Sequence, residues 1–275
     1  MSSKQWSSSL RIMTYNIRED VVNDGKNQWK FRKDRVIGLI RYHSPDIFGV
    51  QEALYHQLVD LQTALTDFSY YGVGRDDGKD KGEFSAIFYL SDRFELLNQG
   101  TFWLSQTPNI PGSKGWDATF PRICSWVKIN DRRTPETLYY FNTHLERDGE
   151  TARREGARLV LTHIQEITGL EAPIILTGDF NAGLDSDAYL TIITDTIFQD
   201  AKCLTETPHY GPSGSKVNFD VTQGVREQID HIFVTPSHFR VLKHANLTDS
   251  YEMCYPSDHL PVLTELIVKE RSQID

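Results

Sequence analysis

Short apolar runs, many of them ending on polar side chains, recur along most of the chain. Residues 10–17 alternate as a strand does, residues 46–52 form a short apolar strand, and residues 173–177 form a buried one. Apolar residues recur at helical spacing in 31–43 and 54–65. The same reasoning predicts further strands at 84–90, 94–104, 123–129, 138–144, 228–234, 241–247 and 260–268, and helices at 150–167 and 187–194.

The order of these elements predicts the fold class. Strands dominate, helices lie between several of them, and no repeat or low-complexity linker divides the chain. This pattern favours an α/β protein in which two packed sheets have helices outside them. We therefore expect a single domain over residues 10–270, preceded by a flexible segment at 1–9. The composition of residues 74–82, rich in Asp, Lys and Gly, predicts an exposed loop.

Composition narrows the class of function. The 38 acidic and 29 basic residues give a net charge of −9, which argues against a basic surface that binds duplex nucleic acid through its phosphates. An acidic pocket that recruits a divalent cation is compatible with this charge. Three cysteines without metal-binding spacing, no signal-peptide pattern and no run of membrane-spanning length predict a cytoplasmic protein. Neither membrane contact nor a protein partner is indicated.

Polar side chains at or near the ends of the predicted strands are the candidate functional residues. They are Asn16, Glu52, His144, Asp179 with Asn181, Asp230, and Asp258 with His259. Mg²⁺ prefers oxygen ligands and often binds one or two carboxylates together with a substrate phosphate. A histidine tuned by a carboxylate can act as acid or base when water attacks a phosphoester. The set therefore predicts a cation-assisted phosphate site.

At these positions the chain resembles the endonuclease/exonuclease/phosphatase superfamily, which has the DNase I-like fold. Six motifs carry the resemblance, in order: Thr14-Tyr15-Asn16, residues 45–52, Asn142-Thr143-His144-Leu145, Thr177-Gly178-Asp179-Phe180-Asn181, Gln228-Ile229-Asp230-His231-Ile232 and Pro256-Ser257-Asp258-His259. Each motif alone is common by chance, but six in order along nearly the whole chain are specific. The resemblance implies a four-layered α/β/β/α sandwich of two packed mixed β-sheets flanked by helices.

The resemblance also implies how the metal and the base are held. Glu52 would be the main ligand of Mg²⁺, for which Mn²⁺ could substitute. Asn16 and Asp258 would help to hold the ion or its waters. His259 would be the base that activates water, oriented by Asp230.

The remaining candidates are implied to contact the phosphate or to support that contact. Asp179 and Asn181 would align the nucleophile, and His144 would contact or protonate the phosphate side. Glu83 resembles the carboxylate that orients this histidine, and Arg122 could supply a cationic phosphate contact. Family mechanisms leave open whether Asp179 or the Asp–His pair takes the proton.

Structural explanations compete with these roles at several positions. Asp179 and Asn181 could cap a turn, Glu83 could be a solvated residue of a charged loop, and Arg122 could pair with a surface acid. Aromatic residues in or beside the predicted loops, among them Phe120, could stack on a base or sugar, although packing of the loop is the commoner role.

Departures from family patterns narrow the function. Arg18 stands where apurinic endonucleases usually have an acid, and the Trp-Cys-Asp-Arg motif of inositol-polyphosphate 5-phosphatases is absent. Residues 178–181, with Ser186 and Tyr189 downstream, are most similar to a compact subgroup of deadenylase-like cytosolic hydrolases. The first hypothesis is a Mg²⁺-dependent phosphodiesterase acting on RNA, single-stranded nucleic acid or a nucleotide-like substrate. Two alternatives remain open, a phosphatase of a small sugar or inositol phosphate and a catalytically silent binding module.

Overall fold

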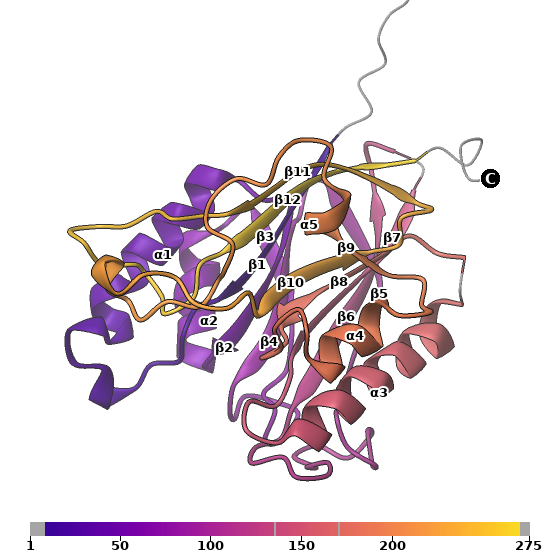
Figure 1. Cartoon of the computed structure of the whole chain (residues 1–275), viewed down its shortest axis with the longest axis horizontal. Coiled ribbons are helices and arrows are strands. Elements are labelled where there is room, and N and C mark those ends of the chain that lie inside the picture. Colours follow the sequence, from indigo (N-terminus) through magenta and orange to yellow (C-terminus); the bar gives the residue numbers. More distant parts are fainter. Residues whose placement is uncertain (1–8, 135, 170, 270–275) are drawn as a thin grey trace, which may run out of the picture.

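The computed structural model describes residues 9–134, 136–169 and 171–269. They form two six-stranded mixed sheets packed face to face, with helices on both outer sides (Figure 1). The segment expected to be flexible, 1–9, lies outside the described residues apart from Ser9, and so does residue 270, the expected end of the domain. No helix among the described residues is long and apolar enough to cross a lipid bilayer.

The first sheet contains the N-terminal and C-terminal strands. Its strand order is β11 (Phe239–Asn246), β12 (Val262–Val268), β1 (Leu10–Asn16), β2 (Ile47–Ala53), β4 (Phe84–Leu90) and β3 (Phe68–Tyr71). β1 and β2 are parallel and are joined through α1 (Trp29–His43), whereas the other neighbours are antiparallel. The helix α2 (Tyr55–Ala64) follows β2, and the short 3-10 helix η1 (Val22–Asn27) precedes α1.

The second sheet repeats this arrangement with the middle of the chain. Its strand order is β5 (Phe94–Trp103), β6 (Ile123–Asp131), β7 (Thr137–His144), β8 (Ile174–Asp179), β10 (Asp230–Val234) and β9 (Gln199–Asp200). β7 and β8 are the parallel pair, joined through α3 (Glu150–Thr168). The helices α4 (Asp187–Ile193) and α5 (Ala201–Leu204) and the 3-10 helix η2 (Val221–Gln223) complete the elements.

Three apolar clusters fill the spaces between the four layers. The first joins α1 and α2 to the outer face of the first sheet and includes Ile40 and Phe48. The second lies between the sheets and includes Ile12 of β1 and Ile175 of β8. The third joins α3 and α4 to the second sheet and includes Val160. Because the layers bury apolar residues against one another in these three clusters, the expected α/β/β/α sandwich is confirmed.

The pattern-based elements agree with the structure to within a few residues at their ends. Two short strands, β3 and β9, were not predicted, because four and two residues are too few for a period to be recognised. The expectation of an exposed loop at 74–82 is wrong at Arg75, whose side chain is buried. A Cβ at Gly74 would lie 2.2 Å from the Lys81 carbonyl oxygen, so the loop folds closely on itself there.

Candidate active site

The candidate residues gather where the parallel strands of both sheets end. On the second sheet, strand register places His144 beside Asp179 across β7 and β8, and Asp179 beside Asp230 across β8 and β10. The first sheet contributes Asn16 at the end of β1 and Glu52 near the end of β2. The Asn16 amide nitrogen is 2.9 Å from an Asp179 oxygen, so the two sheets meet at this site.

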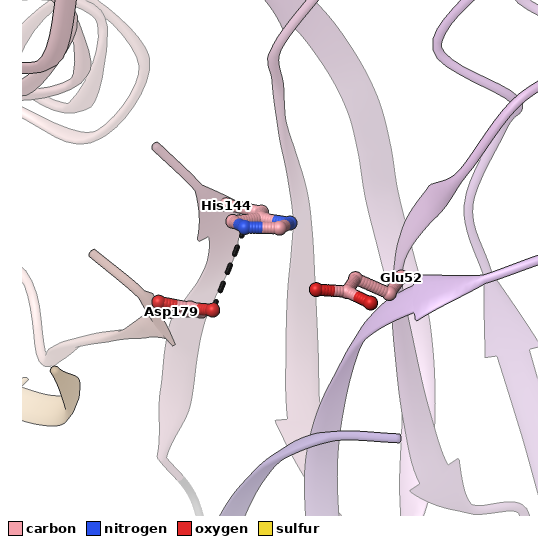
Figure 2. Close-up of side chains that lie close together, drawn as sticks. All are labelled: Glu52, His144 and Asp179. Carbon is pink, nitrogen blue, oxygen red and sulfur yellow. Dashed lines mark ion pairs between the residues drawn. The ribbon is translucent and has the colours of Figure 1, made fainter. Parts of the chain in front are cut away.

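Glu52 enters the site through an irregularity in β2. The pairing of β2 with β4 shifts between Val50 and Ala53, and the φ angle of Glu52 is +61°. This left-handed conformation is uncommon for a residue with a Cβ and costs about 1–3 kcal/mol. Such bulges re-aim side chains, and here the carboxylate points toward the second sheet (Figure 2).

Three side chains form a cluster that could hold a metal ion. One ligand atom each of Glu52, His144 and Asp179 lies within 4.8 Å of the others (Figure 2). The His144 Nε2 atom is 3.4 Å from Asp179 Oδ2. Asn16 donates from its amide nitrogen to Glu52 Oε1 and to Asp179 Oδ2, at 2.9 Å in both cases. The amide of Asn16 thus bridges the two carboxylates and fixes their spacing.

Asp230 and His259 form the second element of the site, a buried pair. His259 Nδ1 is 2.8 Å from Asp230 Oδ2, and its Nε2 is 3.7 Å from Asp179 Oδ2. Burial disfavours the charged imidazole, but the negative charges of Asp230 and Asp179 and the hydrogen bond to Asp230 together outweigh this and raise the pKa of His259 to about 9. Ser215 Oγ donates to the same Asp230 oxygen at 2.6 Å and helps to hold it.

His144 has the opposite electrostatic character. Burial, followed by the positive charge of Arg122, lowers the pKa of His144 to about 3, so its ring is neutral at neutral pH. Its Nε2 atom is 3.0 Å from the amide nitrogen of Asn181, which occupies a turn with φ of +47°. Glu83, expected to orient this ring, lies 3.6 Å from Nδ1 and makes a closer ion pair of 2.6 Å with Arg75.

Asp258 forms an ion pair with Lys216, a residue that was not among the expected site residues. Its Oδ2 atom is 2.8 Å from Lys216 Nζ, which is also 2.8 Å from His259 Nε2. Its Oδ1 atom is buried without a hydrogen-bond partner among the described residues. Burial opposes ionisation, but the charges of His259 and Lys216 hold the pKa of Asp258 below its ordinary value. Asp258 joins neither of the carboxylate–histidine clusters that the described residues form.

Two arginines, Arg75 and Arg122, bring positive charge to the site. Arg122 is buried and pairs at 3.3 Å with Glu146, which is also buried and so is not the surface acid of the structural alternative. Its Nη1 atom has no hydrogen-bond partner among the described residues. The guanidinium of Arg75 lies 5.0 Å from the centre of the Phe120 ring, a cation–π contact.

Most of these groups border one pocket of about 280 Å³, and Asn16, Asp230, Ser215 and Glu146 lie behind its lining. Its cationic side chains are Arg18, Arg75, Arg122, Arg147 and Lys216, and its acidic ones are Glu19, Glu52, Glu83, Asp148, Asp179 and Asp258. With His259 also charged at neutral pH, the cations equal the acids in number, and a bound divalent cation would therefore make the formal balance positive. A pocket with this composition suits an anionic substrate that binds together with a metal.

The residues fit a divalent ion. Glu52 and Asp179 present carboxylate oxygens to a common point, and Mg²⁺ and Mn²⁺ are bound by such oxygens. The unpaired, buried Asp258 Oδ1 is a further acceptor in the same pocket. Like charges this close in a protein interior are costly unless a cation offsets them.

Sequence reasoning missed Arg75, Ser215 and Lys216. All three lie in loops rich in glycine, serine or charged residues, where hydrophobic periodicity carries no information. Arg18 was noted only as a departure from a family pattern, and it lies 3.6 Å from Glu52. The nine expected residues other than Asp230 line the pocket or contact its lining, and Asp230 acts on it through His259.

Comparisons with known proteins place this site in a family context. The chain is 42% identical to a mannosyl-6-phosphatase of Bacteroides thetaiotaomicron, with a TM-score of 0.90, over 94% of this chain and 99% of that one. A second B. thetaiotaomicron protein, described as an endonuclease/exonuclease/phosphatase family protein, is 41% identical with a TM-score of 0.91, over 96% and 98% of the two chains. Nocturnin of Xenopus laevis is 24% identical over 98% of this chain and 75% of its own length.

A family model covers most of the chain as well. Residues 13–259 match the model of the Endonuclease/Exonuclease/phosphatase family, and this range contains all six motifs from Asn16 to His259. The match agrees with the four-layered fold and with the gathering of polar side chains at one rim. The chain belongs to the endonuclease/exonuclease/phosphatase family, a family of phosphoester hydrolases.

Proposed function

We propose that the protein is a divalent-metal-dependent phosphatase that removes the phosphate from a small phosphorylated molecule, a sugar phosphate being the favoured class. The observation that carries this proposal is the pocket of about 280 Å³, in which acids, histidines and five cationic side chains surround one space. Its size is close to the lower end, roughly 300 Å³, of pockets that enclose small molecules. The 42% identity to a mannosyl-6-phosphatase supports the same substrate class.

Water would be activated beside the Asp230–His259 pair. His259 Nδ1 is held by Asp230, which leaves Nε2 to face the pocket, and Asp179 Oδ2 lies 3.7 Å from that nitrogen. A water molecule between the two can pass its proton to Asp179 while His259 is charged, as its pKa of about 9 implies at neutral pH, or to His259 when the ring is neutral. The oxygen then attacks phosphorus, the ester bond to the leaving oxygen breaks, and the products are an alcohol and inorganic phosphate.

The phosphoryl group would be held by neutral and cationic donors. The Asn181 amide nitrogen and His144 Nε2 lie 3.0 Å apart at the end of the second sheet, and each can donate to a phosphoryl oxygen that replaces this contact, His144 as its Nε2–H tautomer. The partly unpaired guanidinium of Arg122 can offset charge that develops there. A divalent ion held by Glu52, with Asp179 or Asp258, would supply charge neutralisation at the phosphoryl and leaving oxygens.

A phosphodiesterase activity is the second candidate. It was the first hypothesis from the sequence, and the similarity to nocturnin along 98% of this chain favours keeping it. RNA or single-stranded nucleic acid would then be the substrate. The pocket volume of about 280 Å³ and the net charge of −9 favour a small substrate over a polymer.

A substrate panel separates these candidates. Purified protein is incubated with Mg²⁺ or Mn²⁺ and with hexose 6-phosphates, glycerol phosphate, bis-p-nitrophenyl phosphate or a single-stranded RNA. We expect metal-dependent release of inorganic phosphate from the hexose phosphates and slower turnover of the diesters. Cleavage of RNA or the diester without phosphate release from any monoester would overturn the proposal in favour of the phosphodiesterase.

A further inference from the structure

Lys216 is positioned by the backbone, not only by its own side-chain contacts. Its main chain forms an antiparallel bridge with His259, and the next amide, Val217 N, donates to the Asp258 carbonyl at 2.8 Å. On the other side, Arg226 N donates to the Lys216 carbonyl at 2.8 Å. The backbone at Lys216 is therefore hydrogen-bonded on both sides, and its side chain lies beside Asp258 and His259.

The ammonium group of Lys216 uses at most two of its three donor hydrogens in this structure, because His259 Nε2 can accept one of them only when the His259 ring is neutral. Nζ is 2.8 Å from Asp258 Oδ2 and 2.8 Å from His259 Nε2, and no third hydrogen bond is found among the described residues. The Lys216 side chain is 29% exposed to solvent and lines the pocket. A lysine ammonium offers three donors, so one remains for a ligand in the pocket.

The position of this free donor matters because His259 Nε2 faces the reacting centre. A phosphoryl group attacked by a water molecule bound at His259 Nε2 must lie one water away from that nitrogen, and so within a short side-chain movement of Nζ. Monoesters carry close to two negative charges at pH 7 and three terminal oxygens. Diesters carry one charge and two terminal oxygens. An extra fixed cation beside the phosphate thus favours the monoester over the diester.

We propose that Lys216 is a substrate-binding residue that contacts the additional terminal oxygen of a phosphomonoester and so sets the preference for monoesters over diesters. The inference rests on the proposed phosphatase function and deepens it. Lys216 donates one hydrogen bond to the phosphoryl oxygen while Asp258 keeps its ammonium in place. Arg18, another cation of the pocket, pairs with Glu52 and does not share the contacts that Lys216 makes with Asp258 and His259.

The test compares two substrates that have the same leaving group. kcat/KM is measured for p-nitrophenyl phosphate and for bis-p-nitrophenyl phosphate with the wild type, Lys216→Met and Lys216→Arg. A charge-assisted hydrogen bond corresponds to a change of roughly 10-fold or more, so Lys216→Met should lower the monoester-to-diester ratio by about that factor. Lys216→Arg, which keeps the charge, should restore part of the ratio.

Lys202→Met is the matched control. Lys202 Nζ donates to the Ser213 carbonyl at 2.7 Å, so this lysine supports the same loop from outside the pocket. Its replacement should leave the ratio at the wild-type value. If Lys216→Met lowers both activities by one factor, or leaves both unchanged, the proposed preference is wrong.

Binding of inorganic phosphate separates this inference from the proposed function. Titration calorimetry of the protein with phosphate requires no turnover, and Lys216→Met should weaken binding by about 10-fold or more. A wild type that hydrolyses only diesters would overturn the proposed function, whatever the binding result. Equal phosphate affinity in the wild type and Lys216→Met would overturn the role of Lys216 even if the protein is a phosphatase.

Discussion

His259 Nδ1 lies 2.8 Å from Asp230 Oδ2, and both side chains are buried at the rim where the two sheets meet. The contact joins the last motif of the chain to the strand β10, which is bound to β8 of the second sheet. It fixes the ring so that Nε2 faces the pocket.

Replacing His259 by alanine should lower kcat by about 10²- to 10⁴-fold, the range that general acid–base groups contribute. Asp230→Asn should also lower kcat, because the carboxylate would no longer hold the imidazole in its orientation. The measurement is phosphate release at saturating substrate and metal. His56→Ala, which alters a half-exposed histidine paired with Asp20, should keep wild-type turnover. Wild-type kcat in His259→Ala would remove this residue from the mechanism.

Glu52→Gln should weaken binding of Mn²⁺ by at least about 10-fold, since even residues that only support metal ligands contribute this much. The reason is loss of one carboxylate charge from the cluster with Asp179 and His144. Electron paramagnetic resonance of free Mn²⁺ gives the affinity without any substrate. Glu252→Gln, at a carboxylate that is 88% exposed, is the control and should bind Mn²⁺ as the wild type does. An identical titration for Glu52→Gln would contradict its assignment as a ligand.

Asn142 should be a large contributor to stability because it joins the two sheets. Its amide nitrogen donates to the carbonyls of Val50 and Ala86 at 3.0 Å, and its Oδ1 accepts from Gln51 at 2.6 Å. Asn142→Ala leaves these buried groups without partners, which should lower the free energy of unfolding by about 2–4 kcal/mol. Urea denaturation measures the change, and Asn98→Ala, on the exposed part of β5, should shift it by less than about 0.5 kcal/mol.

The pH dependence of stability should report on His244, which lies away from the pocket. Burial lowers the pKa of His244 to about 3, while Asp200 opposes and His209 adds to the shift. Because His244 binds a proton less readily in the folded state than in the unfolded state, protonation below about pH 6.5 favours unfolding. The contribution of neutral His244 to the free energy of unfolding is therefore present above about pH 6.5 and is lost as the pH falls toward 3. The free energy of unfolding should therefore decrease through this range.

The assignment of this acid sensitivity to one residue can be checked with His244→Asn. The variant should show a smaller decrease between pH 6.5 and pH 4.5 than the wild type, in urea denaturation at several pH values. The expected difference is up to about 1.4 kcal/mol for each pH unit. His144 is shifted in the same direction, so part of the decrease should persist. A wild-type slope in His244→Asn would show that the pKa of His244 is not lowered in the folded state.

Much of the architecture was determined by the sequence itself. The apolar stripe of α1 and the continuous run of β8 identify elements because burial selects residues at the period of a helix or a strand. The ends of these runs located Asn16, His144 and Asp179, since strands that stop at one rim expose the side chains that follow. The order of the six motifs identified the family, which the match over 13–259 confirms.

Tertiary structure decided which side chains touch. No local pattern predicts that the φ angle of Glu52 is +61°, because the bulge arises from the pairing of β2 with β4. The contact between Lys216 and Asp258 could not be predicted from the sequence either, because the two residues are 42 positions apart and Lys216 lies in a loop without a hydrophobic period. Apolar periodicity records what is buried, whereas contacts between polar side chains depend on distances that only the packed sheets and loops establish. The sequence by itself therefore determined the layers of the fold and the types of side chain at the site, and the tertiary structure determined the distances between those side chains.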